Sequence, residues 1–153
     1  MTIQIENAHL LADRFGYWPS FHDAEILRAR FEREGPDAPW LECDIHVFEM
    51  TSEVDSGGHY VLTKHTLVTL RFCDIGLEEF KWWNHQNVIS SLHIAPNVNP
   101  TQYDRQDWRI EVVIGSSYGC ESKLVCTAIK VMKAADLNEE RSTTPCTPTK
   151  RPT

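Results

Sequence analysis

Two neighbouring stretches of the sequence alternate apolar and polar residues, and this pattern constrains the fold more than any other feature. Over residues 41–47, apolar side chains at odd positions alternate with polar ones such as Glu42 and Asp44. Residues 60–72 alternate in the same way. The sequence Asp55-Ser56-Gly57-Gly58 separates the two stretches, and its glycines suit the positive φ angles of a tight turn. A period of two is typical of a half-buried β-strand, so we expect a long β-hairpin here.

Shorter patterns predict the remaining elements. A helix is expected over residues 7–15, with Asn7 as its N-cap and Gly16 after its last residue. Residues 25–33 favour a strand, and a helix is the alternative because Glu, Leu, Arg and Ala are good helix formers. Further strands are expected over residues 77–83, 87–94, 108–114 and 120–132. The fold class is therefore α+β: a curved, mostly antiparallel meander of about six to seven strands with a short N-terminal helix.

The two ends of the sequence differ in composition. A chain of 153 residues corresponds to one domain, which we place at residues 1–138. Residues 139–153 are rich in Thr and Pro and hold no large aliphatic side chain after residue 141. Such a segment buries too little apolar surface to offset its ordering entropy, so we expect a disordered tail.

The charge balance bounds the class of partner. The chain has 15 Lys and Arg against 22 Asp and Glu, a net charge of -7. Because binding to phosphates needs an excess of cations, we expect neither a nucleic acid nor a membrane as partner. The five cysteines form no C-x-x-C pair and follow no signal-peptide pattern, which favours a cytoplasmic protein with reduced thiols acting as small hydrophobes. They are Cys43, Cys73, Cys120, Cys126 and Cys146.

Sequence motifs of common enzyme classes are missing, including the phosphate-binding, nucleophile-elbow and zinc-protease patterns. A small metal-dependent hydrolase built on His22, Asp23 and His85 is one alternative. The structural interpretation is stronger, because Asp, Asn and Gln in these positions are common caps and turn residues. We therefore expect no enzyme, no catalytic residue, no metal and no cofactor.

Acidic and aromatic side chains suggest where a partner protein binds. Several acidic residues fall on alternating strand positions that we expect to face solvent. Adjacent residues of a strand point to opposite faces, so at most one of Trp82 and Trp83 enters a given core, and an exposed Trp82 or Trp83 is expected. Trp is enriched at binding hot spots. The candidate partner-binding residues are Glu42, Asp44, Glu49, Glu78, Glu79, Trp82 and Trp83.

Three stretches give the chain a resemblance to a known family. They are 15–25 (Phe-Gly-Tyr-Trp-Pro-Ser-Phe-His-Asp-Ala-Glu), the hairpin from 46–51 to 67–72, and 84–89 (Asn-His-Gln-Asn-Val-Ile). With these, the chain resembles the immunity protein 50 family of bacteria. The motif residues shared with that family, to which the resemblance assigns no role, are Trp18, Pro19, Phe21, His22, Asp23, Asn84, Gln86 and Asn87.

The resemblance implies a function that composition alone does not. Such immunity proteins are cognate inhibitors that bind a polymorphic toxin domain stoichiometrically and protect the producing cell. A binding module without a toxin partner is the other non-enzymatic interpretation. Exposed strand edges and Trp side chains also leave a homodimer open.

Overall fold

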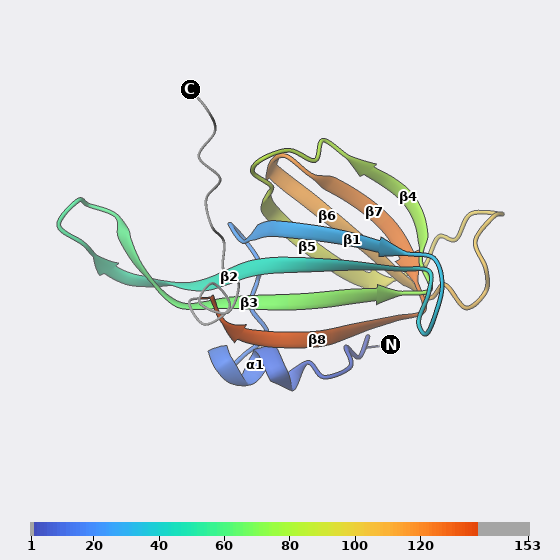
Figure 1. The fold of residues 1–153 in the computed structure, drawn as a ribbon, viewed down its shortest axis with the longest axis horizontal. Helices are drawn as coiled ribbons and strands as arrows, with labels where there is room; N and C mark the ends of the chain where they lie inside the picture. The colour runs from blue at the N-terminus through green and yellow to red at the C-terminus, as the bar shows by residue number, and fades with distance from the viewer. Residues whose placement is uncertain (1, 138–153) are drawn as a thin grey trace, which may run out of the picture.

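The computed structural model describes residues 2–137, which form one helix and one antiparallel sheet of eight strands (Figure 1). Across the sheet the strands are ordered β4-β7-β6-β5-β1-β2-β3-β8. The predicted domain end at residue 138 and the tail at 139–153 lie outside the described residues. In chain order the elements are α1 (His9–Phe15), β1 (Glu25–Glu32), β2 (Trp40–Val54), β3 (Tyr60–Cys73), β4 (Gly76–Lys81), β5 (Val88–Pro96), β6 (Ile110–Tyr118), β7 (Glu121–Cys126) and β8 (Ala128–Asp136).

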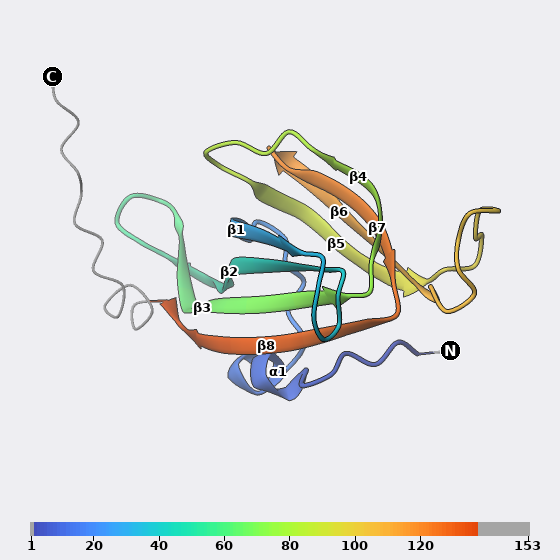
Figure 2. The same ribbon diagram turned by 45° about the vertical axis from the view of Figure 1, so that its right-hand side comes forward.

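The sheet bends sharply between β5 and β1, so that its two halves face each other across the core (Figures 1 and 2). A single residue pair, Glu25 with Val88, joins these two strands. Each half sends alternate side chains inward, as the period of two requires. The core draws on every strand of the sheet except β4 and includes Ile26, Leu41, Ile45, Val68, Phe72, Ile89, Val112, Ile114, Leu124 and Ile129.

Helix α1 and the segment before it cover the edge of the sheet at β8. The backbone of Glu6 pairs with β8 at Lys130, and the helix packs on β8 and β3. Gly16 ends the helix with a φ of 84°, which confirms its predicted role. The predicted N-cap at Asn7 is wrong: Ala8 takes that position without a side-chain cap, because Asn7 itself adopts a left-handed turn conformation.

The long hairpin is confirmed, since β2 and β3 pair along almost their whole length. The prediction of a strand over residues 25–33, and not the alternative helix, is confirmed over Glu25–Glu32. The register of this strand with β2 shifts between Ile26 and Arg28, at a β-bulge that contains Leu27. As a result Ile26 is buried in the core and Leu27 is not.

The predicted meander of six to seven strands is wrong in two respects. Residues 120–132 are not one strand, because the chain breaks at Thr127 into β7 and β8. The N–H of Thr127 donates to the carbonyl of Cys73 at 3.1 Å, outside the strand ladders. From this corner the chain passes from the β7 half of the sheet to the β8 half. The strand order is therefore not sequential: β4 pairs with β7, and β3 pairs with β8.

The cysteines of the described residues are free and buried, which supports their interpretation as small hydrophobes. Burial raises the pKa of the Cys43 and Cys126 thiols to about 12. It raises the pKa of Cys73 and Cys120 to about 11. These four thiols are therefore protonated and unreactive at neutral pH. Cys146 lies outside the described residues.

Candidate partner-binding surface

Residues 15–25, 46–51 and 84–89, which carry most of the family resemblance, come together at one end of the sheet, and residues 67–72 run from there along β3. The hydroxyl of Tyr17 donates to Glu49 of β2 at 3.4 Å. The N–H of Asp23 donates to the carbonyl of Ile89 at 2.9 Å, and the N–H of Ile26 donates to that of Asn87 at 2.9 Å. The loop over residues 17–24 thus joins the hairpin on one side to the start of β5 on the other.

This loop is held in an unusual backbone conformation. Phe21 and Asp23 both have positive φ angles, 62° and 66°, which cost a non-glycine residue about 1 kcal/mol or more each. The buried ring of Phe21 anchors the loop in the core and packs on Trp18 at 5.5 Å between ring centroids. Pro19 is also buried. The anchored aromatic rings therefore hold the strained turn in place.

A small cavity of about 260 Å³ separates the loop from the hairpin. His22 and Asp23 line it from the loop, and Phe48 and Glu49 line it from β2. The Nδ1 of His22 lies 2.9 Å from the carbonyl oxygen of Ser90, and its Nε2 lies 3.6 Å from Asp23. The contact of His22 with a backbone carbonyl is the one that the structural interpretation expected, whereas the carboxylate of Asp23 accepts no backbone N–H within residues 2–137.

The Asn84-to-Asn87 motif shapes the loop between β4 and β5. The side-chain oxygen of buried Asn87 accepts from the N–H groups of Asn84 and Cys120, at 3.1 and 3.0 Å. Its amide nitrogen donates to the carbonyl of Asn84 at 2.8 Å. The side chain of Asn84 accepts from the N–H of Gln86 at 3.1 Å and donates to the carbonyl of Trp82 at 3.1 Å. These motif residues therefore fix the backbone that carries the tryptophans.

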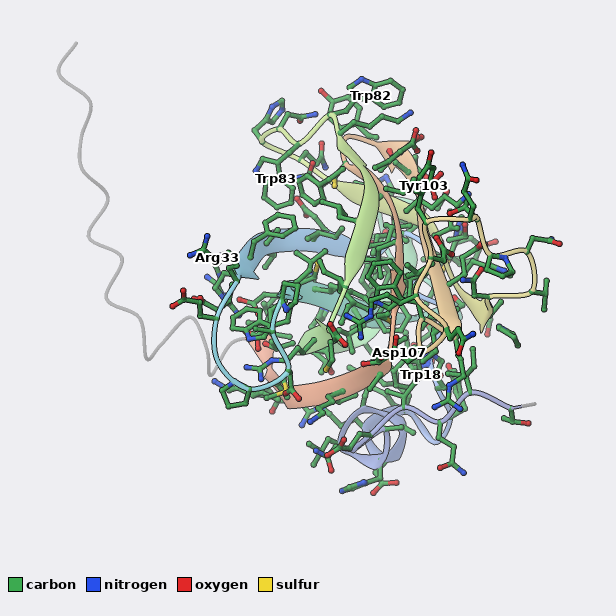
Figure 3. All side chains as sticks on the ribbon, turned by 90° about the vertical axis from the view of Figure 1, so that its right-hand side faces the viewer. Trp18, Arg33, Trp82, Trp83, Tyr103 and Asp107 are labelled. Atoms are coloured by element: carbon green, nitrogen blue, oxygen red, sulfur yellow. The ribbon has the colours of Figure 1, made fainter. Side chains whose placement is uncertain are left out.

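Trp82 and Trp83 are both exposed and lie outside a strand, so the prediction of a strand that continues to residue 83 is wrong. The cause is local: β4 ends at Lys81, and Trp82 takes a left-handed φ of 63°. Figure 3 shows both side chains beyond the end of β4, far from α1. Trp83 stacks on Phe80 at 6.1 Å, and Lys81 lies 4.5 Å above the ring of Trp82.

Two of the predicted partner-binding acids are inaccessible. Glu42 and Asp44 are only 8% and 4% exposed, so the expectation that they face solvent is wrong. Their face of β2 does point away from the apolar core, but arginines of both neighbouring strands cover it. Arg30 of β1 bonds both carboxylates, at 3.2 and 2.7 Å, and Arg71 of β3 bonds Glu42 at 2.7 Å.

Asp44 is the most strongly bound of these acids. Burial by itself raises the pKa of a carboxyl, but hydrogen bonds from Arg30, Arg28 and Thr69 outweigh it and lower the pKa of Asp44 to about 2. The ion pairs continue from Arg71 to Asp37 and from Asp37 to Lys130 of β8. This network of ion pairs links β1, β2, β3 and β8, so we interpret Glu42 and Asp44 as residues that stabilise the sheet.

The other predicted acids stay at the surface. Glu49 is half-buried at the root of the hairpin, where Lys64 bonds it at 2.8 Å and lowers its pKa. Glu78 and Glu79 are exposed on β4, where they lie 3.5 Å from Lys123 and 3.6 Å from Lys81. They share this edge of the sheet with Trp82 and Trp83, so β4 joins two of the predicted groups.

The exposed apolar side chains at the end of the hairpin were not among the predicted partner-binding residues. β1 pairs with β2 only as far as His46, and β8 pairs with β3 only as far as Thr66. Beyond these residues no other strand within residues 2–137 pairs with the two strands, and they project from the body (Figures 1 and 2). We call residues 48–64 the hairpin arm. The sequence did contain a signal for them. Apolar residues continue along both strands beyond the part that packs on the core: Met50, Val54, Tyr60 and Leu62.

The residues of the hydrolase alternative do not form a metal site. His85 packs on Tyr118, with ring centroids 6.1 Å apart, whereas His22 contacts Ser90 and Asp23. Within residues 2–137, His, Cys, Asp and Glu side chains form no group of three that could hold a metal ion. No helix within that range has the length and apolar character needed to cross a membrane.

The fold and this surface define a small β-sheet protein with a projecting hairpin and exposed tryptophans at the end where its sequence motifs meet. The chain belongs to the Immunity protein 50 family, whose sequence profile matches residues 7–135. The match spans α1 and all strands except the last residue of β8. Neither the curated proteins nor the solved structures provide a significant match.

Proposed function

We propose that this protein binds a cognate bacterial toxin domain one-to-one in the cytoplasm and neutralises it by covering its active face. Membership of the Immunity protein 50 family is the observation that carries the proposal. The family supplies the class of partner, and the structure supplies surfaces on which such a partner can bind. The protein acts by affinity and not by turnover.

The rigidity of the motif end supports an occluding role. The left-handed turns of the 17–24 loop and the Asn87 hydrogen bonds hold the backbone around the exposed side chains. A surface that is already ordered loses little conformational entropy on binding, which favours tight inhibition. Stable inhibitory complexes bury about 1,600 Å² in total, with aromatic anchors at the centre.

The charge supports a basic partner. The net charge of -7 repels nucleic acid but attracts a protein whose own cleft is lined by Lys and Arg. A toxin that acts on a phosphate-bearing substrate has such a cleft, and exposed carboxylates such as Glu78 and Glu79 suit its rim. The attraction raises the association rate at low ionic strength.

Co-expression tests this proposal. The toxin domain encoded beside this gene is expressed alone and with the tagged protein, and growth is followed together with co-purification. We expect growth arrest to be relieved and an equimolar complex to be recovered. Persistent arrest without a complex would contradict the proposal and favour a binding module without a toxin partner.

A further inference from the structure

We propose that the hairpin arm, residues 48–64, is the element that enters the partner, and that its socket is an apolar protein cleft rimmed by Lys and Arg. This inference rests on the proposed function, since it names the surface used and the chemistry of the partner. It assigns a role to the part of the chain that the fold itself does not need.

The arm contributes little to the core. Within the described part of the chain, its strands pair only with each other, because the pairing with β1 ends at His46 of β2 and the pairing with β8 ends at Thr66 of β3. An isolated two-stranded ribbon gains little stability in water. Its apolar side chains are only partly covered by the rest of residues 2–137, and Met50, Val54, Tyr60 and Leu62 stay 38% to 58% exposed. We therefore infer that this ribbon contacts another molecule, because its own chain gives it little support.

The apolar residues of the arm share one face. Met50 lies opposite Leu62, and Val54 lies opposite Tyr60, in the strand register. Leu62 and Tyr60 are two residues apart on β3, so their side chains point to the same side. All four are between 38% and 58% exposed. They form a continuous apolar strip along the arm. The strip includes Tyr60, and tyrosine is among the commonest hot-spot residues.

The charge of the arm selects a basic socket. It carries three acidic residues, Glu49, Glu53 and Asp55, against one cation, Lys64, a net charge of -2. Lys64 is already paired with Glu49. Glu53 makes no ion pair with any residue the structure describes. Asp55 lies 3.9 Å from the Nδ1 of His59. The net negative charge of the arm therefore lies near the tip, where Glu53 is next in sequence to Val54 of the apolar strip, and it is complementary to an apolar cleft edged by Lys and Arg.

The arm is ordered before any partner binds. At the turn, the carboxylate of Asp55 accepts from the N–H groups of Gly57 and His59 at 2.8 and 3.0 Å. Along the arm, the hydroxyl of Thr51 donates to the carbonyl of Val61 at 2.8 Å. At the root, Tyr17 reaches Glu49 from the motif loop. These contacts reduce the entropy that insertion would cost, and the last one connects the arm to the family motif.

A pair of matched double variants tests the proposal. Tyr60→Ala with Leu62→Ala removes half of the apolar strip. Val98→Ala with Tyr103→Ala removes apolar side chains that are more exposed, 75% and 82%, in the loop after β5 at the opposite end of the molecule (Figure 1). Affinity for the toxin domain encoded beside the gene is measured by titration calorimetry with the full chain. We expect the arm variant to bind at least about 30-fold more weakly and the control to change less than about 3-fold.

Charge and self-association are tested separately. Glu53→Gln is expected to slow association about 2- to 3-fold and to reduce its salt dependence, whereas Asp13→Asn on the exposed side of α1 leaves both unchanged. Circular dichroism and urea unfolding confirm that each variant is folded. Light scattering of the wild type and the arm variant shows whether the strip instead joins two copies of this chain.

The outcomes separate this inference from the proposed function. Failure of the wild type to bind the toxin domain overturns the proposed function, and the inference with it. Wild-type binding that the arm variant retains in full overturns the inference alone. A wild-type dimer that the arm variant abolishes also overturns it, because the socket would then be a second copy.

Discussion

Asp44→Asn tests whether the charge network on the outer face of β2 stabilises the fold. Asp44 is 4% exposed and accepts hydrogen bonds from Arg28, Arg30 and Thr69. Its pKa of about 2, against an ordinary value of 3.8, means that the fold prefers the ionised carboxylate by about 2 kcal/mol, since one pH unit equals about 1.4 kcal/mol. Asparagine removes the charge and also turns an NH₂ group toward donors, so we expect a loss of about 2–4 kcal/mol at pH 7.

The pH dependence of the loss gives the sharper test. Because the pKa of Asp44 is lower in the folded state, its stabilising effect is fully present above pH 3.8 and disappears as the pH falls through about 2. The free energy of unfolding of wild type and variant is measured by urea denaturation at a series of pH values from 7 to 2. Other carboxylates titrate in both proteins, so the difference between the two curves isolates Asp44.

Glu34→Gln is the control, because the Arg33–Glu34 pair is exposed, and we expect a change below about 0.5 kcal/mol. A difference for Asp44→Asn that is equally small at pH 7 would refute the reasoning. So would a large difference that stays constant down to pH 2, because it would then come from packing and not from charge.

Two further predictions concern the interior. Gly119→Ala is expected to destabilise the protein by about 3 kcal/mol in urea unfolding, because Gly119 has a φ of 83° and an added Cβ would lie 2.3 Å from the carbonyl oxygen of Gln86. Gly58→Ala is the control, since Gly58 has a φ of 81° but open space around it. We expect this control to lose only about 1 kcal/mol in the same assay. In a Cys146→Ser background, the four remaining thiols should react with a disulfide reagent at pH 8 only after denaturant is added, because burial raises their pKa to about 11 or 12; rapid labelling of the native protein would show that they are accessible.

Local patterns predicted much of the fold. The hairpin followed from the alternation in 41–47 and 60–72, because one face of each strand enters the core. The strand order did not follow, since it depends on the corner at Thr127, which sends β8 to β3 and leaves β7 beside β4. Thr and Cys around that corner are good strand formers, so no turn residue marks it.

The candidate site was predictable only in part. Asn84 and Asn87 were correctly interpreted as loop residues, because short polar side chains bond nearby backbone. Asp23 does lie in a turn, but its carboxylate contacts His22 and not the backbone. The burial of Asp44 was not foreseen, because alternation shows only that it points away from the apolar core. Whether that face is exposed to solvent depends on which side chains of β1 and β3 lie beside Asp44. The registers of β1 and β3 with β2 decide this, and they are set by the tertiary structure.

Titration of toxin activity against added protein tests whether this protein neutralises its toxin one-to-one. Purified toxin domain is mixed with increasing amounts of this protein, and the toxin's residual activity is measured at each ratio. We expect the activity to fall linearly and to reach its minimum at one equivalent, because each molecule blocks one toxin. Activity that is unaffected by an excess, or that is abolished by a small fraction of an equivalent as an enzyme would achieve, would contradict it.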